Sequence, residues 1–433
     1  MTLKEISTKK IIFLGLGAEN FFLILWLREK GLINNLTIWD TLSKEKLGDR
    51  YNFLVKDKNI TWIINQKLPD LKDYTLIVRS PGVFISPINR KKLGEKLTGP
   101  MPLFIDFCPT KNIIGITGSK GKGTTSSLIY ELLKNAKKRV WLGGNIGVAP
   151  FSFINKIKAT DYVVLELSSF QLQEFITGPK ISVITNLTHE HLSPADPNNP
   201  NYHPSMNDYW RSKLNITKKS SLLIINKKLV NKLPAKDWSA SGGKIKLFTS
   251  SNLDSNLPGE HNKENIAAAV EVVKYLKIND KIIKKTVKNF NGLEYRIEKI
   301  SEKNGISYYN DSFATTPEAT QTALKSFTSP IILLASGAEK KSDFSKLAKD
   351  IKKQVKYLIL FKGESTTRFK KEVLKTGFNS KNISIANSMK EAINIAQKNA
   401  TKGDIILMSP ACASFGMFKN YKERGKQFTN LVK

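Results

Sequence analysis

Cysteine and long apolar runs are scarce in this chain of 433 residues. The two cysteines, Cys108 and Cys412, lie far apart and lack the spacing of a metal site, which predicts a reducing, cytoplasmic setting. The longest apolar run, residues 21–27, has seven residues, whereas a membrane helix needs about 20. Residues 1–10 are polar and lysine-rich, unlike a secretory signal. We therefore expect a globular protein without a membrane span.

Arginine is scarce as well, although the formal net charge is +32: only nine of the 69 basic residues are Arg. Sequence-specific base recognition relies on bidentate arginine, and the chain has no helix-turn-helix, zinc or aromatic RNA-binding motif. Lysine is spread through every segment, which favours a compositional bias over a specific nucleic-acid partner. A weak affinity for polyanionic substrates is compatible with that bias.

Histidine is also rare, and three of the four histidines are His189, His191 and His203. A zinc site there would need a third ligand at a suitable spacing, which the sequence does not offer. Loop histidines without a functional role are the alternative.

The most informative stretch is the glycine-rich segment 115–125, which follows a short apolar run and precedes a segment with helical apolar spacing. A strand, a glycine-rich turn and a helix N-terminus together form a phosphate cradle, because backbone N–H groups and the helix dipole face the anion. Lys122 adds a positive charge, and the hydroxyl of Thr124 or Thr125 is placed to ligate Mg²⁺.

This segment is a variant of the common P-loop, because Ile116 replaces the first glycine and Gly123 follows the lysine. A glycine-rich loop that binds no phosphate is the alternative. We predict nucleoside triphosphate binding, and the residues expected to contact it are Gly118, Ser119, Lys120, Gly121, Lys122, Gly123, Thr124 and Thr125.

Residues 10–41 predict a βαβ unit whose first turn, residues 15–20, contains Gly-Leu-Gly. Asn20 replaces the third glycine of the dinucleotide fingerprint, so a dinucleotide is weakly supported. A nucleotide-like ligand over the turn, with Asp40 and Thr41 at its rim, is expected instead. The strand at 76–78 leads into Ser80-Pro81-Gly82 on the same side of the parallel sheet.

Glu166 ends an apolar run that reads as a buried strand, and a carboxylate there suits a metal ligand near a P-loop. A solvated turn acid is the alternative. Asn262 and Asn265 lie one turn apart at the start of an alanine-rich helix, where they either read a base edge or cap the helix.

The length of the chain predicts two or three domains, and strands alternate again with lysine-rich helices after residue 295. We expect an α/β fold with a Rossmann-like domain at 1–106, a P-loop ATPase-like domain at 107–294 and a second Rossmann-like domain at 295–433.

Together these segments resemble the Mur ligase family, in family order and over nearly the whole chain. The matching motifs are Gly-Leu-Gly at 15–17, Ser-Pro-Gly at 80–82, Ile-Thr-Gly-Ser-Lys-Gly-Lys at 116–122, Gly-Gly-Asn-Ile-Gly at 143–147, Glu-Leu-Ser-Ser-Phe-Gln-Leu at 166–172, Gly-Glu-His-Asn at 259–262, Asn-Asp-Ser at 310–312 and Ser-Pro-Ala-Cys-Ala-Ser at 409–414.

The resemblance implies an ATP-dependent amide ligase that adds D-glutamate to UDP-N-acetylmuramoyl-L-alanine through an acyl phosphate, with two Mg²⁺ ions. It further implies UDP-substrate, ATP and glutamate binding by the three domains in chain order, and we expect a cytoplasmic monomer. The alternatives are a ligase for L-glutamate, a folylpolyglutamate synthase-like ligase and, from another class, a nucleotide-regulated polyanion-binding protein.

The resemblance also implies residue roles. Lys122 would hold the β- and γ-phosphates, and Lys213 matches a lysine that is carbamylated in the family. The resemblance implies catalytic roles for Lys122, Glu166, His191 and Lys213. It implies metal binding by Thr124, Glu166, His191 and Lys213. Further ATP contacts are implied for Asn262, Asn265, Arg296 and Asp311. The implied UDP-substrate contacts are Gly17, Ala18, Asp40, Thr41, Ser80, Gly82, Asn145, Ser168 and Gln171. Glutamate would be held by Thr315, Lys340, Ser414 and Tyr421.

The chain departs from the family pattern at three places. Phe313 stands where a lysine often pairs with the glutamate carboxylate, and a phenyl ring cannot pair with an anion. Gly123 replaces a hydroxyl residue, as in folylpolyglutamate synthases, so Thr124 is expected to keep the metal role. The segment between His191 and Lys213 is long, which loosens the match of Lys213.

Overall fold

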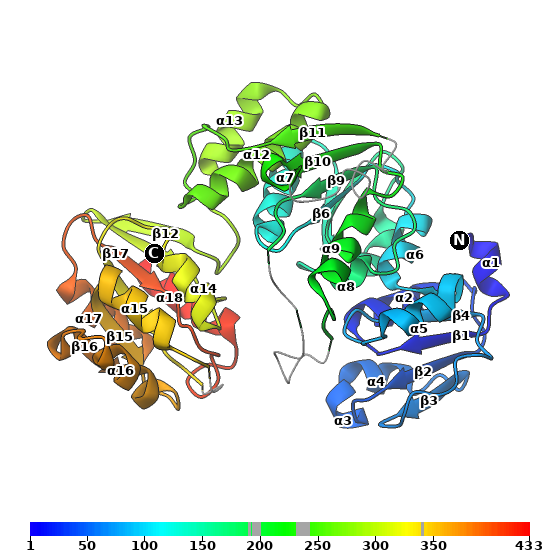
Figure 1. Cartoon of the computed structure of the whole chain (residues 1–433), viewed down its shortest axis with the longest axis horizontal. Coiled ribbons are helices and arrows are strands. Elements are labelled where there is room, and N and C mark those ends of the chain that lie inside the picture. The colour runs from blue at the N-terminus through cyan, green and yellow to red at the C-terminus, as the bar shows by residue number, and fades with distance from the viewer. Residues whose placement is uncertain (189–191, 193–200, 231–242, 339–341) are drawn as a thin grey trace. The chain divides into compact units, whose positions relative to one another are not determined.

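A computed structural model of the chain describes residues 1–188, 192, 201–230, 243–338 and 342–433. The chain divides into two compact units, one made of Met1–Ser251 with Glu264–Ile283 and the other of Asn252–Lys263 with Lys284–Lys433. The described residues form three main sheets, two in the first unit and one in the second (Figure 1). The prediction of an α/β fold is confirmed.

The first sheet is parallel throughout and has the strand order β3-β2-β1-β4-β5. Its strands are β1 (Ile11–Leu14), β2 (Leu36–Asp40), β3 (Ile60–Ile64), β4 (Leu76–Arg79) and β5 (Leu97–Thr98). The helices of this part are α1 (Leu3–Ser7), α2 (Ala18–Glu29), α3 (Lys44–Leu47), α4 (Asp49–Leu54), α5 (Pro87–Leu93) and α6 (Pro100–Phe107). Strands β1, β2 and β4 are buried at every position, as in parallel sheets covered on both faces.

The second sheet is also parallel, with the order β11-β10-β9-β6-β8-β7. Its strands are β6 (Ile113–Thr117), β7 (Val140–Gly144), β8 (Tyr162–Glu166), β9 (Ile181–Ile184), β10 (Leu222–Asn226) and β11 (Lys244–Phe248). The helices are α7 (Lys122–Asn135), α8 (Ser169–Leu172), α9 (Met206–Leu214), α10 (Lys227–Val230), α12 (Glu260–Tyr275) and α13 (Asp280–Asn289). Because Ile116 pairs with Glu166, β6 and β8 end side by side.

The third sheet has the order β12-β13-β17-β14-β15-β16, and only its edge strand β12 runs antiparallel. Its strands are β12 (Glu298–Lys303), β13 (Ile306–Asn310), β14 (Ile331–Ala335), β15 (Val355–Phe361), β16 (Ile383–Ala386) and β17 (Ile405–Met408). The helices are α14 (Pro317–Leu324), α15 (Ser345–Gln354), α16 (Thr366–Lys375), α17 (Met389–Asn399) and α18 (Tyr421–Val432). Strands β12 and β16 were not predicted, since their outward-facing residues break the apolar runs.

Apolar cores lie on both faces of the first and third sheets: one core joins the first sheet to the second, and two cores cover the third sheet. Across the described part of the chain, no helix has both the length and the apolar character needed to cross a membrane.

Candidate active site

The glycine-rich segment forms the predicted strand–loop–helix cradle between β6 and α7. Gly121 caps α7 with a left-handed backbone (φ +80°), and a Cβ there would collide with the side chain of Asn265. Glycine is therefore required on two grounds, conformation and close approach. Because α7 begins at Lys122, its first N–H groups have no acceptor within the helix and face the loop, as an anion site requires.

Two lysines converge on one carbonyl oxygen of this loop. Lys122 Nζ donates to the Gly118 oxygen (2.9 Å) and to the Ser119 oxygen (2.8 Å). Lys213 Nζ, from α9, donates to the same Gly118 oxygen at 2.8 Å and lies 4.8 Å from the centre of the Tyr209 ring. Lys213 is almost fully buried. The structure thus brings together two residues that lie 91 positions apart and that the motifs alone could not join.

The other side of the loop is fixed by the end of β9 and by α9. The Ser119 N–H donates to the Asn186 carbonyl (2.9 Å), and the Lys120 N–H donates to the Asn186 side-chain oxygen (2.8 Å). The Ser119 hydroxyl also lies 2.8 Å from the hydroxyl of Tyr209. These contacts hold the first half of the loop rigid, so that the second half, from Gly121, is left to face a ligand.

Oxygen donors lie beside the cradle. Glu166 is buried at the end of β8, where its Oε1 accepts a hydrogen bond from Asn145 Nδ2 (2.8 Å). The Thr125 hydroxyl is buried and has no hydrogen-bond partner among the described residues, whereas Thr124 is half-buried. A carboxylate and hydroxyls next to a phosphate site fit the donor chemistry of Mg²⁺. His191 lies outside the described residues, and those residues hold no group of three His, Cys, Asp or Glu side chains suited to a metal.

The first βαβ turn is held by Asp40, whose two carboxylate oxygens accept from the N–H groups of Leu16 (2.7 Å) and Leu42 (2.9 Å). Asp40 is thus engaged with the backbone, and Thr41 beside it is exposed. The Asn20 side chain donates to the Gly15 carbonyl at 2.7 Å, which explains how the turn closes without the third glycine.

Predicted substrate residues from the two sheets of the first unit meet around this turn. A Cβ on Gly17 would come within 2.7 Å of Ser80 Oγ, while Ala18 and Gly82 are exposed nearby in sequence. Ser168 caps α8 in a capping box with Gln171, and Gln171 Nε2 donates to Glu19 Oε1 at 2.5 Å. Gln171 therefore joins the second sheet to the first.

Sequence reasoning missed Arg79 and Glu174, which form a buried bidentate ion pair between the two sheets. The Arg79 Nε and Nη2 atoms lie 2.9 and 2.7 Å from the two Glu174 carboxylate oxygens, and the side chains are 1% and 5% exposed. Arg79 also donates to the carbonyls of Val83 and Phe170. The pair thereby ties the Ser-Pro-Gly loop to α8, and neither residue belongs to a motif that could have revealed it.

His203 was also missed as a contact residue, although its histidine cluster was noted. It is fully buried, with Nδ1 2.6 Å from Asp208 Oδ2 and Nε2 2.9 Å from Ser169 Oγ. Burial lowers the pKa of His203, although its contact with Asp208 opposes the change. Arg90 of α5 donates to the other oxygen of Asp208 at 2.7 Å. This network connects α5, α8 and the helix that carries Lys213.

In the second unit lie two predicted nucleotide residues: Asp311, which directly follows β13, and Asn262, in the first turn of α12. Asp311 is buried and accepts hydrogen bonds from the Ser409 hydroxyl (2.7 Å) and the Ile297 N–H (3.2 Å). Burial raises the pKa of Asp311 to about 7. Asn262 lies in the first turn of α12, where its side-chain amide donates to the Pro258 carbonyl (2.7 Å).

Two further predicted residues of this unit, Arg296 and Tyr421, both contact Phe313. The guanidinium of Arg296 lies 3.9 Å from the centre of the Phe313 ring, and the Phe313 and Tyr421 rings are nearly perpendicular, with centroids 5.1 Å apart. Phe313 thus provides a platform for Arg296. Thr315 follows closely and is half-buried, and Ser414 is buried. Lys340 lies outside the described residues.

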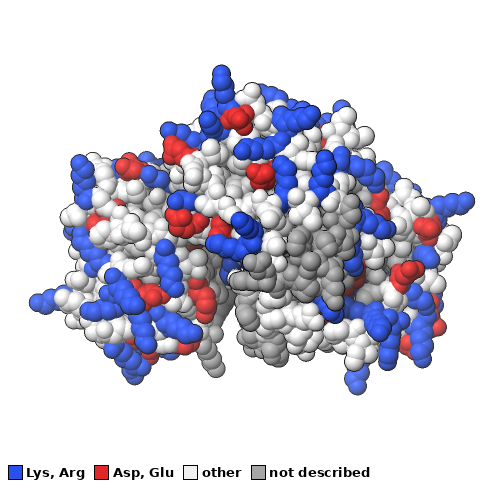
Figure 2. Space-filling view, turned by 45° about the horizontal axis from the view of Figure 1, so that its top comes forward, with Lys and Arg blue, Asp and Glu red and all other residues white. Residues whose placement is uncertain are grey.

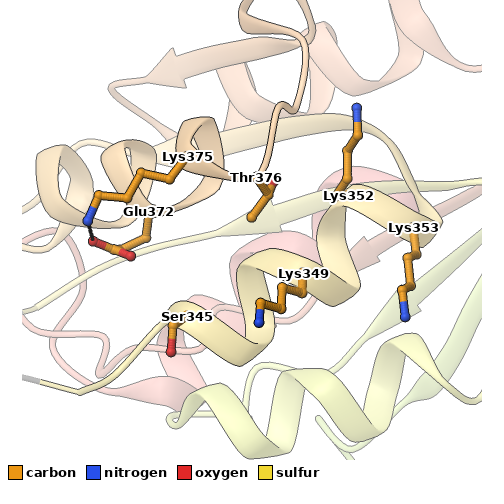
Figure 3. Close-up of a pocket in the computed structure, with 7 residues that line it drawn as sticks. All are labelled: Ser345, Lys349, Lys352, Lys353, Glu372, Lys375 and Thr376. Carbon is orange, nitrogen blue, oxygen red and sulfur yellow. Dashed lines mark hydrogen bonds and ion pairs between the residues drawn. The ribbon is translucent and has the colours of Figure 1, made fainter.

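A separate hollow of about 430 Å³ lies between α15 and α16 (Figure 3). It contains none of the predicted site residues, and its lining is Ser345, Lys349, Lys352, Lys353, Glu372, Lys375 and Thr376. Figure 2 shows Lys and Arg spread over the visible face with acidic residues among them. We therefore assign this lysine-rich hollow to the general lysine bias of the chain.

Comparison with known proteins places these observations in a family. The family description "Mur ligase middle domain" matches residues 116–236, and "Mur ligase, glutamate ligase domain" matches residues 295–412. UDP-N-acetylmuramoylalanine–D-glutamate ligase of Clostridium botulinum (strain Langeland) is 38% identical over 459 residues, which cover 99% of this chain and 97% of the relative. The protein of the same name from Clostridium tetani is 35% identical, with 99% and 98% covered.

Solved structures agree in fold. The MurF ligase of Thermotoga maritima in complex with ADP has a TM-score of 0.56 and 15% identity, covering 99% of this chain and 98% of that one. The UDP-N-acetylmuramate-alanine ligase of the same organism has a TM-score of 0.54 and 16% identity, covering 98% and 99%. The resemblance drawn from the motifs is confirmed.

Proposed function

The chain belongs to the UDP-N-acetylmuramoylalanine–D-glutamate ligase family of Mur ligases, and on that premise we propose that it joins D-glutamate to UDP-N-acetylmuramoyl-L-alanine at the expense of ATP. The reaction belongs to the synthesis of peptidoglycan precursors in the cytoplasm. The observation that carries the proposal is the convergence of Lys122 and Lys213 on the Gly118 carbonyl, in the loop that follows β6, whose neighbouring strand β8 ends at Glu166.

The first step activates a carboxylate, which is a poor electrophile. The alanyl carboxylate of the substrate attacks the γ-phosphorus of ATP, the bond to the β-phosphate oxygen breaks, and ADP leaves with that electron pair. Lys122 would move from the loop carbonyls to the β- and γ-phosphates, where its charge offsets the charge that develops on the oxygens. The N–H groups at the start of α7 would hold the same phosphates.

The second step forms the amide. The glutamate amine attacks the acyl phosphate carbonyl, a tetrahedral intermediate forms, and inorganic phosphate leaves as the amine loses a proton. Because the amine and the acyl phosphate must meet in one geometry, positioning contributes most of the acceleration. We assign the seating of glutamate to Thr315, Lys340, Ser414 and Tyr421, and the further nucleotide contacts to Asn262, Asn265, Arg296 and Asp311.

The oxygen ligands beside the loop support Mg²⁺ binding, and we propose two ions, which would neutralise charge on the phosphates. We assign their binding to Thr124, Glu166, His191 and Lys213. A carbamate on Lys213 would turn this cation into an oxygen ligand and would also remove one of the two positive charges beside Gly118. Mass spectrometry of the intact protein in ¹³C-labelled bicarbonate tests the carbamate.

The reaction is tested by measuring ADP release with UDP-N-acetylmuramoyl-L-alanine and either D-glutamate, L-glutamate or no amino acid. We expect stimulation by D-glutamate. Stimulation by L-glutamate instead would identify the chain as the alternative ligase for L-glutamate. We would attribute that preference to Phe313, since this residue replaces a charged partner of the amino acid. No stimulation by either enantiomer would refute the function. Sedimentation of the purified protein tests the proposed monomer.

A further inference from the structure

Glu19 is a carboxylic acid at the place where the proposed substrate would bring its diphosphate. It lies in the first turn of α2, directly after Gly17 and Ala18. Its Oε1 is bonded to Gln171 Nε2 at 2.5 Å, whereas its Oε2 is buried and has no hydrogen-bond partner among the residues that the structure describes. A buried polar oxygen without a partner is costly, and it calls for a ligand group.

We propose that the protonated Glu19 carboxyl binds the sugar-nucleotide substrate by donating a hydrogen bond from Oε2 to an oxygen of the diphosphate. The inference rests on the proposed function, which supplies the diphosphate. It adds a binding residue that no motif indicates, and it predicts that substrate binding takes up a proton.

The geometry around Glu19 points to an anion. The N-terminus of the 12-residue helix α2 carries unpaired N–H groups and the positive end of a helix dipole. Ser80 packs closely against Gly17, since a Cβ there would come within 2.7 Å of Ser80 Oγ, and Gln171 bonds Glu19 from the second sheet. The hydrogen-bond partner of Glu19, Gln171, and its sequence neighbours Gly17 and Ala18 are already assigned to the same substrate.

The protonation state decides whether Glu19 attracts or repels that anion. Burial raises the pKa of Glu19 to about 7, although the hydrogen bond from Gln171 and the charge of Arg79 act in the opposite direction. Arg79 is the charged group that faces Glu19, from the end of β4, but its guanidinium is already paired with Glu174. A neutral carboxyl can donate a hydrogen bond to a phosphate oxygen, whereas an ionised one has no proton to donate and carries the same charge as the phosphate.

The expected effect follows from the fraction of protein that holds the proton. With a pKa of about 7, that fraction falls by roughly 25-fold between pH 6.5 and pH 8.5, and the apparent dissociation constant rises by the same factor when only the protonated form binds. Binding at pH 7 then takes up about half a proton.

The test is calorimetric titration of the full-length protein with UDP-N-acetylmuramoyl-L-alanine, without ATP, at pH 6.5 and 8.5 and in two buffers of different ionisation enthalpy. We expect the wild type to bind about 25-fold more weakly at pH 8.5. The Glu19→Gln variant keeps an uncharged donor, so it should bind within about threefold of the wild type at pH 6.5, show no weakening at pH 8.5, and take up no proton.

Glu95→Gln, at an exposed position of the same sheet region, is the matched control and should behave as the wild type. Glu19→Ala should bind weakly at both pH values, and circular dichroism checks that each variant is folded. A pH dependence that persists unchanged in Glu19→Gln, or a wild type whose binding ignores pH, overturns the role of Glu19 alone. Absence of binding at every pH, with ATP binding intact, overturns the proposed substrate as well.

Discussion

The two compact units stabilise buried charge in opposite ways. In the first unit, the buried guanidinium of Arg79 meets a carboxylate in a bidentate pair. In the second unit, the equally buried Arg424 donates instead to uncharged oxygens, those of the Ser312 hydroxyl and carbonyl and the Cys412 carbonyl. Burial lowers the pKa of Arg424 to about 10.

The two units thus compensate a buried guanidinium in different ways, one by an ion pair and the other by neutral hydrogen bonds. The ion pair of the first unit joins two sheets and fixes the proposed substrate loop, so its loss would leave one buried charge unpaired. The hydrogen bonds of Arg424 connect the end of β13 to the Ser-Pro-Ala-Cys-Ala-Ser segment within one sheet. The first unit should therefore respond strongly to the loss of Arg79, whereas the loss of Arg424 from the second unit leaves only neutral acceptors behind.

The largest effect is expected at Lys122, in the loop of the first unit. Lys122→Ala should retain the fold but lower ADP formation by at least about 10³-fold, because the phosphates lose their main neutralising charge. The measurement is single-turnover ADP release, with circular dichroism for the fold. Lys134→Ala, an exposed position on the same helix, is the control and should keep normal turnover. Near-normal turnover of Lys122→Ala would refute the site.

The next effect tests the comparison directly. Arg79→Met should destabilise the first unit by about 3–5 kcal/mol, because Glu174 is left buried without its partner. Arg424→Met should cost less, about 1–3 kcal/mol, since it leaves neutral acceptors behind. The free energy of unfolding of both variants, measured by urea denaturation and by calorimetry, shows whether Arg79→Met loses more stability than Arg424→Met. Equal losses in the two variants would mean that pairing with a carboxylate is not what distinguishes the units.

The second unit should lose stability as the pH rises. An aspartate titrates near 3.9 in the unfolded chain, whereas the pKa of folded Asp311 is raised to about 7. The folded state therefore binds more protons between these values, and stability falls from pH 4 to pH 7 by at most about 4 kcal/mol. Asp311→Asn should remove this part of the pH dependence, as thermal unfolding between pH 5 and 8 would show. If stability still falls with pH as steeply in Asp311→Asn as in the wild type, Asp311 does not cause this pH dependence.

The comparison also shows what the sequence can reveal. Many of the buried strands and the phosphate loop were predicted, because apolar runs, glycines and helix spacing are local features, whereas strands such as β12 and β16 were not. The contacts that hold the loops are not local: Glu19 lies 152 residues from Gln171, and Arg79 lies 95 residues from Glu174. No periodicity relates such pairs. His203 shows the same limit, because a loop histidine and a buried one bonded to Asp208 and Ser169 look alike in sequence.

The smallest predicted effect concerns Phe313, where the chain departs from its family. The face of the Phe313 ring packs against the guanidinium of Arg296, and the Phe313 and Tyr421 rings pack in a T-shaped pair. At an exposed site such a stack contributes about 0.5–1 kcal/mol, so Phe313→Leu should raise the KM for ATP roughly two- to fivefold and leave kcat and stability nearly unchanged.

Phe313→Trp keeps an aromatic face under the guanidinium and should restore the KM, whereas Phe313→Lys should instead improve glutamate binding while weakening that of ATP. Steady-state kinetics with each substrate varied in turn separates these effects. If Phe313→Leu changes only the KM for glutamate, Phe313 serves the amino acid through Tyr421, and the stack with Arg296 does not position the nucleotide. The aromatic platform would then replace the missing lysine by shape rather than by charge.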